Sequence, residues 1–209
     1  MRRSTLILFL LVTLYSYAQE LTINESGKKL KKFYLGLDVE HLWLAGGHVN
    51  CQTGLPDAPS TTEIEKSHSP VFVAELCHRQ GLYILRPPQH PQDMLANDQC
   101  DWLTTAEAKI QGWNLIAGDD IYKQAQDYAN KGHVVVAIYK NAAPNATGHV
   151  AAVMPALISS KELSEEGPKI IMAGTHNFNN ISLKAGFKHH VTTWPASGIL
   201  FYYNVKETK

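Results

Sequence analysis

The feature that most constrains the fold is a pair of short β-branched segments joined by turn-forming residues. The first segment is Val-Val-Val-Ala-Ile-Tyr over residues 134–139, and the second runs from Gly148 through His149 to Val153. The eight residues between them are rich in Asn, Ala, Pro and Thr. β-branched residues favour strands, whereas Asn and Pro favour turns. The sequence therefore predicts a β-hairpin whose second strand begins at His149.

A histidine at the start of a strand suits the role of a general base. Sheet hydrogen bonds hold its backbone while the ring can face a cleft. A histidine that merely caps a strand explains the same residues equally well. The hairpin alone leaves both interpretations open.

The rest of the chain predicts helices first and antiparallel strands second. Ser69 followed by Pro70 is typical of a helix start, with the serine as N-cap and the proline in the first turn. This helix is expected to end at Gly81. Further helices are expected over 33–44, 91–103 and 119–130, a charged loop over 159–169, and strands over 170–179 and 198–203. This order predicts an α+β fold with N-terminal helices packed on an antiparallel sheet.

The N-terminus has the pattern of an export signal. Two arginines precede an apolar run over 6–14, and small residues stand at positions 16 and 18. This pattern predicts a signal peptide over 1–18 and a single mature domain over 19–209. The apolar run is short for a bilayer span, and no later stretch is longer. We therefore expect a secreted or periplasmic protein with no integral membrane span after cleavage.

Charge and cysteine content exclude several function classes. Lys plus Arg and Asp plus Glu both number 19, so the formal net charge is 0 and a nucleic-acid partner is not expected. The three cysteines, Cys51, Cys77 and Cys100, fit no zinc-binding spacing. We expect neither a metal site nor an organic cofactor.

Three segments could together carry nucleophilic chemistry. Unpaired N–H groups at a helix start activate a nucleophile, a histidine on a facing strand takes its proton, and a polar residue on the next strand orients the ring. Here the helix starts at Ser69, the strand histidine is His149, and the next strand carries Thr175, His176 and Asn177. Because strand side chains alternate, only one set from that last strand can reach the cleft.

Several stretches resemble the papain-like NlpC and CHAP cell-wall amidases, most closely a secreted bacterial group within them. The most diagnostic is Gly148-His149-Val150-Ala151. The others lie at 39–43, 53–54, 72–74, 83–88, 95–97 and 173–178. The resemblance covers most of the mature chain. It implies a papain-like fold and hydrolysis of amide bonds in peptidoglycan or related peptides.

The resemblance also assigns roles, with one departure. It implies His149 as the base and Asn177 as the residue that orients it, with His176 as the alternate. Such proteins open the helix with His-Cys-Ser, whereas this chain reads His68-Ser69-Pro70, so Ser69 stands at the nucleophile position. Three interpretations stay open: a deliberate replacement of cysteine, a natural inactive homologue that binds cell-wall peptide or a protein, and a working serine hydrolase. In each of them Ser69 also suffices as an N-cap.

Three further residues are candidates for contact with substrate. His68 precedes the nucleophile position and could line the cleft, Arg86 could hold a substrate carboxylate, and Trp43 could stack on a sugar. A solvated loop histidine, a structural salt bridge and a tryptophan of the core or cleft wall are the respective alternatives. The expected partners are a peptidoglycan or peptide substrate and an inhibitor or immunity protein that blocks the cleft.

Overall fold

The computed structural model describes residues 21–57, 67–143 and 145–206 of the 209-residue chain. The expected signal peptide, residues 1–18, lies outside the described residues. Among the residues that are described, no helix is long and apolar enough to cross a membrane.

A six-stranded sheet forms the centre of the fold, with every neighbouring pair antiparallel. Its order is β1-β6-β2-β3-β4-β5, which places the predicted hairpin in the middle. The strands are β1 (Trp113–Leu115), β2 (Val135–Tyr139), β3 (His149–Val153), β4 (Lys169–Met172), β5 (Phe178–Ser182) and β6 (Ile199–Asn204).

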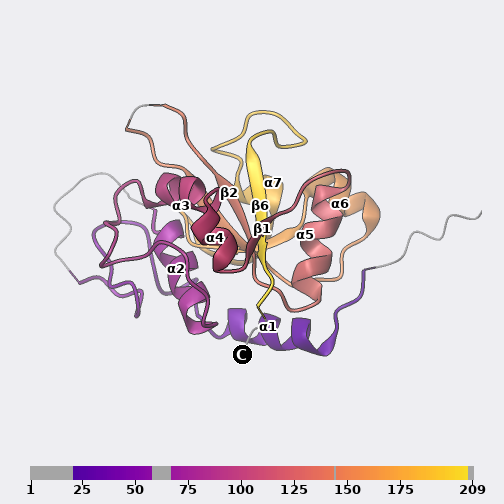
Figure 1. The fold of residues 1–209 in the computed structure, drawn as a ribbon, viewed down its shortest axis with the longest axis horizontal. Helices are drawn as coiled ribbons and strands as arrows, with labels where there is room; N and C mark the ends of the chain where they lie inside the picture. The colour runs from indigo at the N-terminus through magenta and orange to yellow at the C-terminus, as the bar shows by residue number, and fades with distance from the viewer. Residues whose placement is uncertain (1–20, 58–66, 144, 207–209) are drawn as a thin grey trace, which may run out of the picture.

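Helices cover both faces of this sheet (Figure 1). The described helices are α1 (Glu25–Leu35), α2 (Ser69–Arg79), α3 (Leu95–Leu103), α4 (Ala106–Ile110), α5 (Ile121–Asn130), α6 (Ser160–Glu166) and α7 (Leu183–Gly186). The first three contribute to one buried apolar cluster, and α5 and α7 contribute to a second. The sheet therefore separates two cores.

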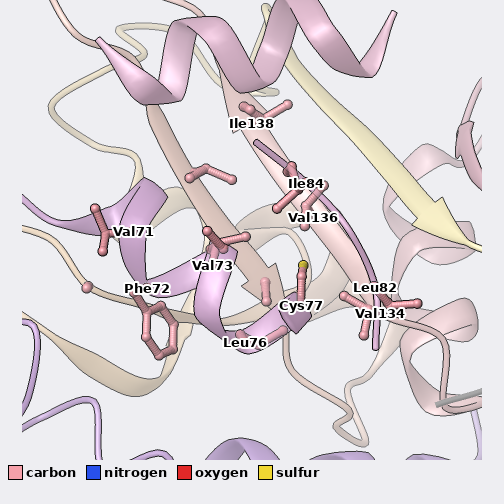
Figure 2. Packing of buried hydrophobic residues seen from close by; sticks show 14 of the residues in the cluster. Val71, Phe72, Val73, Leu76, Cys77, Leu82, Ile84, Val134, Val136 and Ile138 are labelled. Atoms are coloured by element: carbon pink, nitrogen blue, oxygen red, sulfur yellow. The ribbon is translucent and has the colours of Figure 1, made fainter. Parts of the chain in front are cut away.

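Alternation along β3 assigns its residues to these cores. Val150 and Ala152 belong to the cluster under α2, whereas Ala151 and Val153 belong to the cluster under α5 and α7. Figure 2 shows the first cluster, in which apolar residues of α2 lie against Val136 and Ile138 of β2. Because β2 and β3 are buried on both faces, they read as continuous apolar runs in the sequence.

The hairpin prediction is confirmed. β2 and β3 pair antiparallel, with Tyr139 opposite His149. The α+β prediction is confirmed as a mixed fold with an antiparallel sheet. The expected separation of N-terminal helices from later strands is wrong, because α5, α6 and α7 each lie between strands in the chain order.

The helix expected over 33–44 is wrong and lies earlier in the chain. Helix α1 begins after Asn24, whose side chain accepts a hydrogen bond from the N–H of Gly27, and ends at Gly36. Its lysine-rich sequence is helical because Leu30 and Tyr34 share a buried face. Beyond it the chain is irregular, with Asp38 and Trp43 in the left-handed region.

Two later predictions also need correction. The expected charged loop over 159–169 contains α6, which begins at a capping box in which Ser159 accepts a hydrogen bond from the N–H of Glu162. The single strand expected over 170–179 is two strands, β4 and β5, that pair with each other. The chain reverses between them, so Thr175, His176 and Asn177 lie in the turn rather than in a strand.

Candidate active site

Ser69 is the first residue of α2, and His68 is its N-cap. The predicted assignment of Ser69 as N-cap is therefore wrong by one residue. His68 has backbone angles of φ −105° and ψ 25° and makes no capping side-chain hydrogen bond. The Ser69 hydroxyl instead accepts a long hydrogen bond, 3.5 Å, from the backbone N–H of Val150. The hydroxyl is thus directed at the start of β3, not at its own helix.

His149 begins β3, and its side chain is enclosed by aromatic rings. The side chain of Phe187 meets it edge-on at 4.8 Å between centroids, and the His190 ring stacks on it at 4.7 Å with 9° between the planes. The residue is 2% exposed, and no hydrogen bond to its Nε2 is found in the part of the chain that the structure describes. A buried polar atom without a partner is costly, so such atoms mark candidate sites of ligand contact.

Burial decides the protonation state of this imidazole. Desolvation lowers the pKa of His149 to about 3, and the neighbouring His190 lowers the pKa further in the same direction. Burial also lowers the pKa of His190, with His189 as the second cause. Both rings are neutral near pH 7, and a base works best when its pKa lies near the working pH. In this setting His149 is a weak base, and its neutral ring is better suited to hydrogen bonding than to accepting a proton.

Ser69 and His149 approach the start of β3 from different sides. Ser69 belongs to α2, whereas alternation places the His149 side chain with Ala151 on the face of α5 and α7. The hydrogen bonds of the described residues include none between the two side chains. Their meeting point is the backbone of Val150, the residue after His149. The sequence predicts a histidine on a strand that faces the helix of Ser69; in the structure the strand itself lies between the two side chains.

Asn177 is committed to the backbone around the site. Its Nδ2 donates to the carbonyl oxygens of Val39 at 2.7 Å, Leu42 at 2.9 Å and Trp43 at 3.3 Å. Its Oδ1 accepts a hydrogen bond from the N–H of Gly174 at 2.9 Å. Both polar atoms are thus engaged by backbone groups, which leaves the role of orienting His149 directly without support from these contacts.

Asn177 reaches His149 only through Gly174. A methyl group added at the Gly174 Cα would stand 3.7 Å from Cε1 of His149 and 2.5 Å from Cε of Met172. Gly174 therefore closes the pocket around the imidazole ring, and Asn177 fixes Gly174. His176, the predicted alternate, is exposed on the turn.

The predicted substrate contacts fall in different places. His68 is 4% exposed and lies beside Ser69 at the start of α2. The expectation that Trp43 contacts substrate is wrong, because its ring is fully buried against Phe72 and its Nε1 donates to the carbonyl of Cys51. Arg86 pairs with the buried Glu75, which is the structural salt bridge given above as the alternative.

Arg86 also lines a pocket of about 450 Å³ between residues 48–57 and residues 86–92. Neither Ser69 nor His149 lines this pocket, and both are nearly inaccessible at 1% and 2% exposure. The chemistry expected at Ser69 and this pocket are thus separate features.

Sequence reasoning missed His190 and Phe187 as part of the site. His189 is exposed, whereas its neighbour His190 stacks on His149. The signal was a ring at position 187 followed three residues later by another, a spacing that places side chains together in a helical turn. In the described part of the chain, no group of three His, Cys, Asp or Glu residues is arranged to hold a metal ion.

The cysteines do not supply a better nucleophile. Burial raises the pKa of Cys51 to about 11 and places the pKa of Cys77 well above its usual range. The pKa of Cys100 is raised by burial and by the charge of Asp101. Because the thiolate is the reactive form of cysteine, these raised pKa values disfavour all three residues as nucleophiles.

Comparisons with known proteins give no family for this chain. No protein-family model matches the sequence, no curated protein matches it, and no solved structure matches its fold.

Proposed function

We propose that the protein is a papain-like amide hydrolase directed at peptidoglycan or related peptides, with Ser69 at the nucleophile position and His149 as its base. The observation that carries the proposal is that two groups approach the start of β3 from opposite sides of the strand. One is a hydroxyl at the first turn of an 11-residue helix that does not cap that helix. The other is a buried imidazole whose Nε2 lacks a hydrogen-bond partner among the described residues.

The proposed reaction begins with attack of Ser69 Oγ on the amide carbon. The hydroxyl proton passes to His149, the carbonyl oxygen becomes an oxyanion, and the imidazolium then protonates the departing amine nitrogen. Water hydrolyses the resulting ester with His149 again accepting the proton. Free N–H groups at the start of α2 would stabilise the oxyanion. Because Ser69 and His149 share no hydrogen bond and lie on opposite sides of β3, the proposed proton transfer requires the start of β3 to rearrange when substrate binds.

The same proposal places the protein outside the cytoplasm. Its substrate is cell-wall peptide, and residues 1–18 have the pattern of an export signal. A protein inhibitor or immunity partner would act by covering the start of α2.

A binding module without catalysis is the second candidate, and a specific observation favours it. A pKa of about 3 makes His149 a weak base, and a serine hydroxyl is a poorer nucleophile than the thiolate of the resembling proteins. In this case the scaffold recognises cell-wall peptide but does not cleave it.

Digestion of purified peptidoglycan tests both candidates, with products identified by mass spectrometry. The proteins to compare are the Ser69 protein itself, Ser69→Cys, Ser69→Ala and His149→Gln. Release of peptide by the Ser69 protein and not by Ser69→Ala or His149→Gln supports the hydrolase. Release by Ser69→Cys alone supports a hydrolase scaffold that serine has silenced. Sedimentation with peptidoglycan without any release supports the binding module, and neither release nor binding overturns both candidates.

A further inference from the structure

We propose that the pocket between residues 48–57 and residues 86–92 binds the terminal carboxylate of a peptide, with Arg86 as its main ligand. This inference rests on the proposed function, because it names the part of the peptide substrate that lies beside Ser69. It has its own binding test, which does not require catalysis.

The pocket has a size and a charge that suit the end of a peptide. Its volume of about 450 Å³ lies within the range of roughly 300–1,000 Å³ found for small-ligand sites. The ionisable groups that line it include Arg86, His48, His90 and Asp57. Asp57 is hydrogen-bonded to His48, so its carboxylate already has a partner within the protein, and Arg86 is the one arginine among the described residues of the lining.

Arg86 keeps positive charge that the protein does not fully neutralise. The buried carboxylate of Glu75 accepts a hydrogen bond from Nε of Arg79 at 2.8 Å. It also accepts one from Nη2 of Arg86, at the longer distance of 3.4 Å. One carboxylate between two guanidinium groups leaves an excess of one positive charge. The side chain of Arg86 is only 13% exposed, whereas that of Arg79 is 39% exposed and also donates to the carbonyl of Gln52. Water therefore screens Arg79, and a bound anion would compensate Arg86.

Two contacts tie this pocket to the first turn of α2. The side-chain amide of Gln99 donates to the carbonyl of Pro70 at 3.0 Å and to that of Leu85 at 2.9 Å. Pro70 follows Ser69, and Leu85 precedes Arg86. The buried amide of Gln99 therefore connects the first turn of α2 to the segment that carries Arg86. On the other wall, Sγ of Cys51 lies 3.9 Å from the carbonyl oxygen of Val71. A peptide held by its carboxylate in the pocket is thereby placed next to the helix that carries Ser69.

A carboxylate fits this recess better than other anions do. The guanidinium group is a planar fork that matches the two oxygens of a carboxylate. Only one arginine lines the pocket, together with a paired Asp57 that opposes a more highly charged group such as phosphate.

The test is a titration of the full-length Ser69→Ala protein, followed by backbone amide NMR shifts. The probes are the dipeptide Ala-Ala with a free carboxylate, as L,L and D,D forms, and the same dipeptides as C-terminal amides. We expect at least one free-carboxylate form to shift the amides of residues 48–52 and 86–92, and its amide counterpart to bind more weakly. Equal binding of acid and amide, shifts confined to other residues, or no binding of either dipeptide would overturn the inference.

Arg86→Lys and Arg79→Lys form a matched pair for the same titration. Both variants keep a positive charge beside Glu75, so the buried carboxylate stays compensated. Loss of the fork at Arg86 should weaken carboxylate binding about tenfold, because charge-assisted paired hydrogen bonds are among the strong ones. Arg79→Lys, which lies outside the pocket, should bind within about twofold of the parent. Equal affinity in the two variants, or tighter binding of inorganic phosphate than of the dipeptide, also contradicts the assignment.

Failure here and failure of the proposed hydrolysis are distinguishable. Carboxylate binding that depends on Arg86, combined with no release from peptidoglycan, keeps the pocket and removes the hydrolase. Peptide release that does not change in Arg86→Lys keeps the hydrolase and removes the pocket from substrate recognition.

Discussion

The imidazole ring of His149 lies parallel to that of His190, with 4.7 Å between the ring centroids and 9° between the ring planes. Phe187 closes the edge of His149, and Tyr139 contacts His190 from β2. This arrangement stacks two neutral rings in a buried setting. Two protonated rings at the same distance would repel each other, so the contact depends on pH.

We expect the free energy of unfolding to fall as the pH is lowered below about 6.5. The pKa of His149 is about 3 in the folded protein and near the usual 6.5 in the unfolded chain, so the unfolded state binds more protons between these values. The contribution is fully present above pH 6.5 and is lost progressively as the pH falls toward 3. Urea unfolding at pH 7, 6, 5 and 4 measures it.

The matched variants for this prediction are His149→Phe and His176→Gln. The first keeps a ring in the stack but removes the titrating group, so the dependence on pH should become shallower. The second removes an exposed histidine and should leave the dependence unchanged. An equal dependence in all three proteins would show that His149 is not the group responsible.

Gly148→Ala should disrupt the hairpin next to His149. A Cβ at Gly148 would stand 2.1 Å from the carbonyl oxygen of Tyr139 and 2.7 Å from Oδ1 of Asn97. Since a backbone atom is the nearer neighbour, the strands must separate, and we expect a loss of about 3 kcal/mol. Gly36→Ala is the control, because its Cβ would lie 3.4 Å from the nearest atom, and it should change the stability by less than about 1 kcal/mol. Thermal unfolding distinguishes the two; similar melting temperatures would contradict the predicted close contact.

Asn177→Ala should release the irregular segment around Val39 and Trp43. The substitution removes the donor for three carbonyl groups and the acceptor for Gly174. We expect a loss of about 2 kcal/mol, along with faster hydrogen exchange at Gly174. His176→Ala, one residue earlier and exposed, should stay within about 0.5 kcal/mol of the parent. Unchanged exchange at Gly174 in Asn177→Ala would disprove the positioning role.

Glu75→Gln should be strongly destabilising. It removes the carboxylate that compensates Arg79 and Arg86, and Arg86 is mostly buried. Breaking one side of a buried pair costs about 3–5 kcal/mol, and the exposure of Arg79 places our expectation at the lower end. The comparison variant is Glu162→Gln, whose pair with Lys169 is partly exposed and should cost less than about 1 kcal/mol. Chemical denaturation of both variants checks the difference.

The parts of this fold that could be predicted are those decided by neighbours in the chain. β2 and β3 are recognisable because β-branched runs flank a turn, and α2 because proline follows Ser69. The sequence did not predict α1, because its buried face is narrow and four lysines occupy much of its remaining surface. α6 was missed although Ser159 and Glu162 form a capping box, because its charged composition resembles a loop.

The candidate site was predictable only as a list of residues at one end of β3. Whether Ser69 and His149 face each other depends on which side of the strand each occupies, and that follows from the cores on both faces of the sheet. Asn177 lies far from Val39 in sequence, so its hydrogen bonds to that segment leave no local pattern. The stacking of His190 on His149 depends on how the turn after α7 docks against β3, which the local spacing of Phe187 and His190 does not specify.

Helix α1 docks on residues that are synthesised about a hundred positions later. The N–H of Asn24 donates to the carbonyl of Asn130, and a side chain at Gly27 would lie 2.0 Å from that same oxygen. On the ribosome, the first helix therefore emerges long before its partner surface exists. Its hydrogen bond to Asn130 cannot form until α5 has left the exit tunnel, so the first described element to be made is among the last that can take its final place.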